Sequence, residues 1–501
     1  MCDARGMQLH GTLASTSDAA VDAACVVDVV DVIDDTPAPP STYAPSPLAR
    51  VARAFVEFAF ACLAVAFRAA QLALVPVLAV TPACVARAAQ RGAFAIGYRA
   101  YVGAPGRWLH KRMIAHAAGQ GAEAHAKAGA PVACGSSVIV TIPFLTDNYC
   151  YLIIDGATRT AAAVDPADPE RVARVAEKLK VRITCALTTH KHHDHAGGNA
   201  ELADILRGDG DHGGEIKVYG HERDACHGAT DRAEDGAVVH VGETRVLVTH
   251  VPCHTLGHVT YAVMDARAPC GSESLEHAIA MFTGDAIING GVGAFFHGNA
   301  EDCYDNLHAR LAPTPDACLI FSGHEYMEMN LRFAKMLDDD DEITANAFYA
   351  ILLHRHRDCA TMPSSFRVER RLNPFFRCRD RAYLKRLLDK KLWFMERKRR
   401  PWWHRYVGAQ GSRLAKQRAR VIEQHPLAVR LREDAASESA AASRAAGVCG
   451  IDLVQELMSD SFASGASLKE GNEEEHDNFM LYARAMSAQG NVRVVPAELV
   501  G

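Results

Sequence analysis

The pattern of hydrophobic and polar positions divides the chain into regions of different kinds. Between residues 138 and 164, β-branched and aromatic residues form runs that predict strands. Residues 169–180 have helical composition, and residues 181–187 form a short apolar run typical of a buried strand. Strand and helix patterns then alternate as far as residue 320, and the pattern after Tyr326 is helical. This order predicts an α/β domain followed by a helical one.

The densest chemical signal follows the apolar run at 181–187. Residues 190–195 contain four histidines and one aspartate within six positions. Because side chains alternate at the end of a strand, His190 and His192 can share one metal ion while Asp194 and His195 reach another. The pattern therefore predicts two adjacent metal ions.

Further candidate ligands lie later in the chain. His254, Asp285 and His324 each follow an apolar run with a glycine close by, as expected of loops at one edge of a sheet. The predicted ligands are His190, His192 and His254 for one ion, Asp194, His195 and His324 for the other, and Asp285 as a bridge between them. Zinc is the expected ion, and the same donor set also accepts iron or manganese.

These residues stand in motifs that resemble a known family. Four segments resemble motifs of the metallo-β-lactamase superfamily: THKHHDHAGGN (189–199), PCHTLGH (252–258), FTGD (282–285) and SGHEY (322–326). Three others resemble motifs of glyoxalase II, the hydroxyacylglutathione hydrolase family: IPFLTDNYCYL (142–152), GVGAFFHG (291–298) and NPFFR (373–377). The resemblance is continuous over about residues 138–336. It implies an α/β fold, the metallo-β-lactamase αβ/βα sandwich, with a C-terminal helical domain that holds a thiol substrate.

The resemblance also implies an activity. It predicts a dimetal thioester hydrolase that converts S-D-lactoyl-trypanothione or S-D-lactoylglutathione to D-lactate and free thiol, in methylglyoxal detoxification. Asp194 and Asp285 are the predicted catalytic residues, and Asp194 is suited to orient water or accept its proton. A thioester suits such a site because its thiol leaves with a pKa of about 8.5 and needs no strong general acid. Two alternatives stay open: a mono-iron persulfide dioxygenase of the same fold, and a membrane-associated scaffold with a silent site.

The choice of thiol depends on a charge that is missing. Glutathione-using members of the family usually carry Lys where this chain has Ala294. GVGAFF and Tyr482 resemble the trypanosomatid branch, which uses trypanothione, a glutathione–spermidine conjugate. Amidation removes the glycine carboxylate of that thiol and adds a cationic polyamine, which a basic pocket would repel. Phe296, Tyr326 and Tyr482 are the predicted substrate-binding residues.

Composition bounds the class of protein. The 501 residues are 49% hydrophobic and 23% charged, as in ordinary soluble proteins, and the net charge of −6 argues against a nucleic-acid-binding surface along the whole chain. Fifteen cysteines, an odd number, occur without a secretory signal. They favour free thiols in a reducing compartment, so a cytoplasmic location is expected.

The N-terminal part is expected to form two regions. Residues 1–50, with seven Asp and two Arg, predict a disordered acidic arm. Residues 51–136 are a hydrophobic and basic helical region, in which 54–86 carries only Glu57 and Arg68 as charged residues. This stretch predicts either a membrane-associated hairpin or a helical pair packed on the catalytic domain. The chemistry of the site is expected to be independent of this region.

The remaining chain is expected to form two domains. Residues 137–336 are the predicted catalytic domain, and residues 337–501 the predicted helical substrate-binding domain. An insertion is expected at about 378–473, at first strongly basic with three tryptophans and then rich in Ala, Ser and Glu. Its basic part predicts contact with anionic lipid, contact with nucleic acid or a solvated helix face.

Overall fold

The computed structural model describes residues 96–100, 102–119, 125–126, 129–208, 216–271, 273–338, 340–356, 358–398 and 492–494. The acidic arm at 1–50, the apolar segment 54–86, Tyr482 and most of the expected insertion lie outside the described residues. Among the helices that are described, none combines the length and the apolar character needed to cross a membrane.

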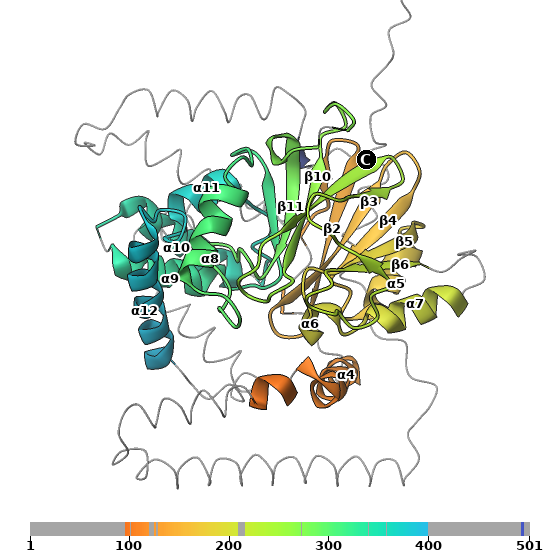
Figure 1. Cartoon of the computed structure of the whole chain (residues 1–501), viewed down its shortest axis with the longest axis horizontal. Coiled ribbons are helices and arrows are strands. Elements are labelled where there is room, and N and C mark those ends of the chain that lie inside the picture. The colour runs from red at the N-terminus through yellow and green to blue at the C-terminus, as the bar shows by residue number, and fades with distance from the viewer. Residues whose placement is uncertain are drawn as a thin grey trace, which may run out of the picture.

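Two β-sheets form the centre of the fold (Figure 1). The first contains β1 (Val132–Cys134), β2 (Ser137–Phe144), β3 (Asn148–Asp155), β4 (Thr160–Val164), β5 (Arg182–Leu187), β6 (Lys217–Gly220), β7 (Asp231–Arg232) and β14 (Val492–Val494). The second contains β8 (Val238–Val241), β9 (Thr244–His250), β10 (Val259–Met264), β11 (Ala278–Gly284), β12 (Leu319–Ser322) and β13 (Ser364–Ser365). Their strand orders are β14-β1-β2-β3-β4-β5-β6-β7 and β13-β12-β11-β10-β9-β8. Strands β4 to β7 are parallel, as are β11 and β12.

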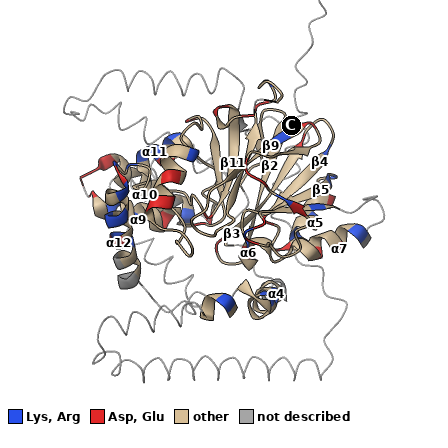
Figure 2. Cartoon of the chain, in the orientation of Figure 1, with Lys and Arg blue, Asp and Glu red and all other residues tan. Residues whose placement is uncertain are grey.

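Both faces of the first sheet are covered, which explains its long apolar runs. Every residue of β2 and β3 is buried. Side chains alternate along a strand, so Ile139 of β2 enters the core between the sheets, where it joins Phe282. Its neighbour Val140 packs with α5 (Pro169–Lys178) and α7 (Asn199–Gly208) on the other face. Charged residues accordingly lie mainly on helices and loops (Figure 2).

Helix α5 shows how the sequence sets the boundaries of an element. The side chain of Asp168 accepts a hydrogen bond from Arg171 N and so caps the first turn. Pro169 follows at a position where no backbone N–H is needed. The helix expected at 169–180 is therefore confirmed.

Helices also cover the outer face of the second sheet. A third core cluster joins this sheet to η2, a π-helical turn (Asn306–Arg310), and to α8 (Ala300–Asp305), α9 (Met327–Leu337), α11 (Phe366–Leu372) and α12 (Arg381–Lys398). Helix α10 (Glu342–His356) packs on α9. The layers run helix, sheet, sheet, helix (Figure 1). This confirms the expected αβ/βα sandwich with a C-terminal helical region.

The C-terminal part contains two elements that the sequence did not predict. Residues 381–398, expected to begin a basic insertion, form α12, which packs against α8. Leu384 and Leu387 are buried, so the basic positions share their helix with an apolar face. Residues 492–494 form β14, which pairs with β1 in the first sheet, so this part of 337–501 is not helical.

A buried carboxylate joins α11 to a loop of the second sheet. Glu369 is fully buried and accepts hydrogen bonds from Gly290 N, the Ser364 hydroxyl and Asn373 Nδ2. Asn373 also donates to Gly291 O at 2.9 Å. Burial raises the pKa of Glu369 to about 7, against the opposing effect of these hydrogen bonds. The NPFFR segment therefore fixes the start of the GVGAFFHG loop.

We expect Glu369→Gln to remove a pH-dependent loss of stability. The pKa of this carboxyl is higher in the folded than in the unfolded protein. The contribution of the protonated carboxyl to the free energy of unfolding is therefore fully present below the unfolded-state pKa and is lost as the pH rises through about 7. The loss is at most about 3 kcal/mol of the free energy of unfolding. Urea unfolding at about pH 5 and pH 8 measures it. Glu276→Gln, at an exposed position, is the control and should keep the wild-type pH dependence. Equal pH dependence of E369Q and wild type would contradict this account.

Candidate metal centre

Strand ends from both sheets meet at one edge, and the loops that leave them carry the candidate ligands. Strand β5 leads into the loop 188–192 and then α6 (His193–Ala196). Strand β11 ends directly before Asp285, and β12 ends two residues before His324. His254 lies on the connection between β9 and β10.

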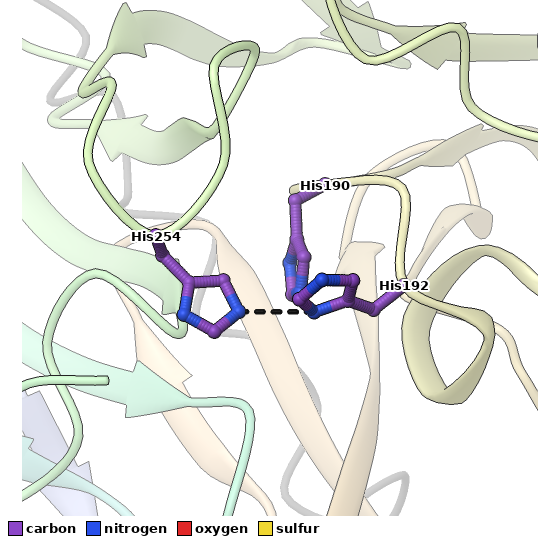
Figure 3. A group of neighbouring side chains, drawn as sticks. All are labelled: His190, His192 and His254. Atoms are coloured by element: carbon purple, nitrogen blue, oxygen red, sulfur yellow. Dashed lines mark hydrogen bonds between the residues drawn. The ribbon is translucent and has the colours of Figure 1, made fainter. Parts of the chain in front are cut away.

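Three histidines direct ring nitrogens toward one point (Figure 3). His192 Nδ1 lies 2.9 Å from His190 Nε2 and 3.0 Å from His254 Nε2, and all three side chains are buried. On the outer side of its ring, His254 Nδ1 lies 2.7 Å from Ala294 O. Because a carbonyl oxygen only accepts, this Nδ1 carries the proton. His254 Nε2 therefore presents a lone pair to the other two rings.

Thr189 determines the proton position of His190 in a similar way. The amide and the hydroxyl of Thr189 donate to Asp165, at 2.8 and 2.7 Å. Since the hydroxyl proton is used there, Thr189 Oγ1 accepts from His190 Nδ1 at 3.1 Å. His190 Nε2 then presents a lone pair as well. The outer nitrogen of His192, Nε2, lies 2.9 Å from the hydroxyl of Tyr98.

Asp194, His195 and His324 form a second cluster beside the first. Asp194 Oδ2 lies 3.5 Å from His324 Nε2 and 3.9 Å from His195 Nε2. The outer nitrogens of these two rings meet carboxylates. His195 Nδ1 is 2.9 Å from Asp165 Oδ2, and His324 Nδ1 is 3.1 Å from Asp147 Oδ1. Both Nδ1 atoms donate, so the Nε2 atoms are the ones that face Asp194.

Asp285 lies between the two clusters. Its Oδ2 is 3.4 Å from His254 Nε2, and its Oδ1 is 3.5 Å from both His195 Nε2 and His324 Nε2. Within the described part of the chain this buried Oδ1 has no hydrogen-bond partner. An unpaired buried carboxylate oxygen is costly unless a cation lies beside it.

The donor set fits two divalent ions. Ligand atoms within 4.8 Å of one another come from three overlapping groups, which are His190/His192/His254, His190/His195/Asp285 and Asp194/His195/His324. Imidazole nitrogens and carboxylate oxygens are the ligands of catalytic zinc, iron and manganese sites. The fold and these clusters together suggest a two-metal site.

The electrostatics of the two clusters differ. Burial lowers the pKa of His190 and of His192, and the neighbouring imidazoles lower both further. At His195 and His324 burial acts in the same direction, but the surrounding carboxylates, Asp285 foremost, outweigh it. They raise the pKa of His195, and that of His324 to about 10. The second cluster therefore carries negative charge that a cation would neutralise.

Two glycines allow the strand ends to approach so closely. A Cβ on Gly323 would lie 2.5 Å from His195 Cε1 and 2.7 Å from Asp285 Oδ1. Gly284 has a φ of +47°, and a Cβ there would lie 2.5 Å from Thr189 Oγ1. The glycines of the FTGD and SGHEY motifs are thus required by the packing of loops from different sheets.

The structure brings all seven predicted ligands together. Of the predicted substrate-binding residues, Phe296 lies beside the first cluster, with its ring centroid 5.2 Å from His192. Tyr326 stacks on His324, with 4.8 Å between ring centroids. His258 joins neither cluster; its Nε2 accepts a hydrogen bond from Asp285 N.

Some residues that hold the site were missed by the sequence reasoning. Asp224 accepts hydrogen bonds from Lys191 N, the Thr255 hydroxyl and Gly257 N, so it ties the loop 188–192 to the connection that carries His254. No motif singled it out. The outer partners missed are Asp147, Asp165 and Tyr98, and Asp147 stands within the family motif IPFLTDNYCYL, which gave a usable signal.

Comparison with protein families agrees with this geometry. Residues 144–268 match the Metallo-beta-lactamase superfamily, and residues 325–400 match the family model described as Hydroxyacylglutathione hydrolase C-terminus. The fold and the site thus define a protein of the metallo-β-lactamase superfamily. The crystal structure of ETHE1 from Myxococcus xanthus aligns at 24% identity and a TM-score of 0.36, over 54% of this chain and 93% of that chain.

Curated relatives narrow the class. The chain is 39% identical over 240 residues to the cytoplasmic hydroxyacylglutathione hydrolase of Arabidopsis thaliana. The aligned region covers 48% of this chain and 87% of that relative. It is 34% identical over 242 residues to the hydroxyacylglutathione hydrolase of Dictyostelium discoideum, with coverages of 46% and 83%. It is 37% identical over 239 residues to that of Gloeobacter violaceus, with coverages of 47% and 87%. The chain belongs to the hydroxyacylglutathione hydrolase family.

Asp285→Ala is expected to lower bound metal from two ions toward one per chain and to reduce hydrolysis at least about 100-fold, because this carboxylate touches both clusters. Elemental analysis of the purified protein measures the first effect, and a thioester hydrolysis assay the second. Asp204→Ala is the control, since that side chain is 71% exposed on α7. Retention of two ions with near-normal turnover in D285A would refute the bridging role.

Proposed function

We propose that this protein hydrolyses S-D-lactoyl thioesters of a glutathione-type thiol, at a two-metal centre held by His190, His192, Asp194, His195, His254, Asp285 and His324. The observation that carries the proposal is the position of Asp285. Its two oxygens face different clusters, and the oxygen that faces the second cluster is buried without a hydrogen-bond partner in the described residues. Zinc is the proposed ion, and the names of the curated relatives support the thioester.

When bound, two such ions lower the pKa of a coordinated water to about 7 and polarise a carbonyl oxygen. The chain itself would position the water and take its proton. Asp194 is suited to both tasks because it is the only one of the seven side chains that is not buried. Its Oδ2 also accepts a hydrogen bond from Asn148 Nδ2 at 3.1 Å, which fixes the direction of the carboxylate.

The bond changes then need no protein nucleophile. The water oxygen bonds to the thioester carbon, one of the two water protons passes to Asp194, and the C–S bond breaks with release of a thiolate. The thiolate then takes up the proton from Asp194, and the new carboxylic acid loses its remaining proton to solvent. A thiol with a pKa of about 8.5 leaves without a strong general acid. The products are D-lactate and the free thiol.

The substrate would lie between Phe296 and Tyr326. These two rings lie beside different clusters, so they flank the centre on both sides. We propose that the thiol portion contacts Tyr326, whose ring is held by stacking on His324. Tyr482 stays a proposal from the sequence.

The missing cation at position 294 supports trypanothione as the thiol. Ala294 is exposed, so it leaves this part of the loop without charge. Helix α12 does bring a cation to the loop: Lys391 Nζ donates to Val292 O at 2.8 Å and lies 5.0 Å from the centroid of the Phe375 ring. Burial lowers the pKa of Lys391 to about 8. This ammonium is engaged with the loop itself and does not replace a cation at the exposed position.

The alternative reactions are less well supported. A persulfide dioxygenase uses a single iron, so it would not explain why Asp194, His195 and His324 form a second group of ligand atoms. A scaffold without activity would not explain why both clusters direct histidine nitrogens with free lone pairs into a buried space. Release of D-lactate from lactoyl-trypanothione and lactoylglutathione, measured in parallel with metal content, tests the proposal. Oxygen consumption with a glutathione persulfide and no thioester hydrolysis would favour the dioxygenase.

Ala294→Lys is expected to raise the preference for lactoylglutathione over lactoyl-trypanothione. A partly exposed pair between the new ammonium and the glycine carboxylate stabilises binding by about 0.5–1 kcal/mol, so the ratio of the two kcat/KM values should shift by about 2- to 5-fold. Ala294→Met, which adds similar length without charge, is the matched control. An unchanged ratio in A294K, or a wild type that already prefers lactoylglutathione, would remove the case for trypanothione.

A further inference from the structure

The segment that precedes the catalytic domain lies against the metal centre. Helix α4 (Ala104–Gly119) contacts α6, the short helix that carries Asp194 and His195 (Figure 1). His110 of α4 donates from Nε2 to Ala167 O at 3.0 Å, and His193 Nε2 donates to Gly103 O at 3.2 Å. These contacts fix the segment on the same edge as the ligand loops.

The packing is close on both sides of this contact. A Cβ on Gly197, which directly follows α6, would lie 2.8 Å from His110 Cδ2. Lys111 forms an ion pair with Glu201 of α7 at 2.9 Å. The segment is therefore fitted to the catalytic domain on the side where the ligand loops lie.

Tyr98 extends this contact to the centre itself. Its hydroxyl lies 2.9 Å from His192 Nε2, and its ring stacks on Phe296 with 5.2 Å between centroids and 20° between planes. His297 lies edge-on to the same ring at 5.1 Å, and Lys191 Nζ lies 5.8 Å from its centroid. One side chain thus touches a predicted ligand and a predicted substrate-binding residue.

The four other predicted histidine ligands each form a hydrogen bond through the outer ring nitrogen, and the partners all lie within residues 137–336. Their partners are Thr189 for His190, Asp165 for His195, Ala294 for His254 and Asp147 for His324. His192 differs, because the partner at its outer nitrogen comes from the N-terminal segment. Neither matching family model includes that segment, since they cover residues 144–268 and 325–400.

We propose that Tyr98 is a positioning residue that completes the metal centre and forms one wall of the substrate site together with Phe296. A histidine that ligates through Nδ1 must carry its proton on Nε2. The oxygen of Tyr98 can accept a hydrogen bond from that Nε2–H, which stabilises the tautomer of His192 that leaves Nδ1 free. The stacked ring of Tyr98 holds Phe296 toward the thioester. This inference rests on the proposed two-metal function.

The hydroxyl and the ring make separable contributions. Tyr98→Phe removes the hydrogen bond to His192 and keeps the stacking on Phe296. Chelator extraction from the zinc-loaded full-length protein should then release one ion about 10-fold faster than wild type and the other at the wild-type rate, because the second cluster is untouched. Tyr98→Ala should show the same release and also a KM for the thioester raised by about 2- to 10-fold, since it loses the stacking as well.

Ile96→Ala is the matched control, because that side chain belongs to the same segment and is 73% exposed. It should keep both release rates and the KM of wild type. The proposal is overturned if Y98F releases both ions at wild-type rates, or if I96A changes as much as Y98F. The rate of metal release is measured without substrate. A protein that binds two ions but hydrolyses no thioester would therefore refute the proposed hydrolase activity, and the metal-release rates of Y98F would still test the role of Tyr98.

Discussion

The convergence of ligand atoms between the two sheets is the interaction on which the rest of the structure depends. Fixed outer hydrogen bonds place the protons of His190, His195, His254 and His324 on Nδ1, which turns their Nε2 atoms inward. Carboxylates of Asp194 and Asp285 face the same space. The nitrogen lone pairs and the carboxylate charges repel one another in this buried, low-dielectric space unless cations lie between them. The arrangement of these atoms therefore suits bound metal ions.

The architecture follows from the need to hold these atoms in place. Ligands come from both sheets, so the sheets must pack with their strand ends at one edge. Gly284 and Gly323 permit the close approach, and Asp165 ties His195 and Thr189 to the end of β4. Glu369 holds Gly290 and Asn373 holds Gly291 at the start of the GVGAFFHG loop, whose Ala294 carbonyl orients His254. Helices of the C-terminal region thus act on the site through the loop they support.

The sequence was sufficient for the fold class and for the seven clustered side chains, because strand ends and motifs are local patterns. It was less informative about the outer hydrogen bonds. Asp224 and Tyr98 reach the site from segments without a local signal, and their contacts span long distances along the chain. The charges of the basic stretch at 381–398 also masked the apolar face with which α12 packs on α8. Burial of that face depends on tertiary contacts.

The central claim is that this chain holds two ions on distinct clusters joined by Asp285. Anomalous scattering from crystals of the zinc-loaded protein tests it most directly, because each ion gives its own peak. The account predicts two peaks about 3.5–4 Å apart, one among His190, His192 and His254 and the other among Asp194, His195 and His324, with Asp285 in contact with both. A single peak at full zinc loading would contradict it.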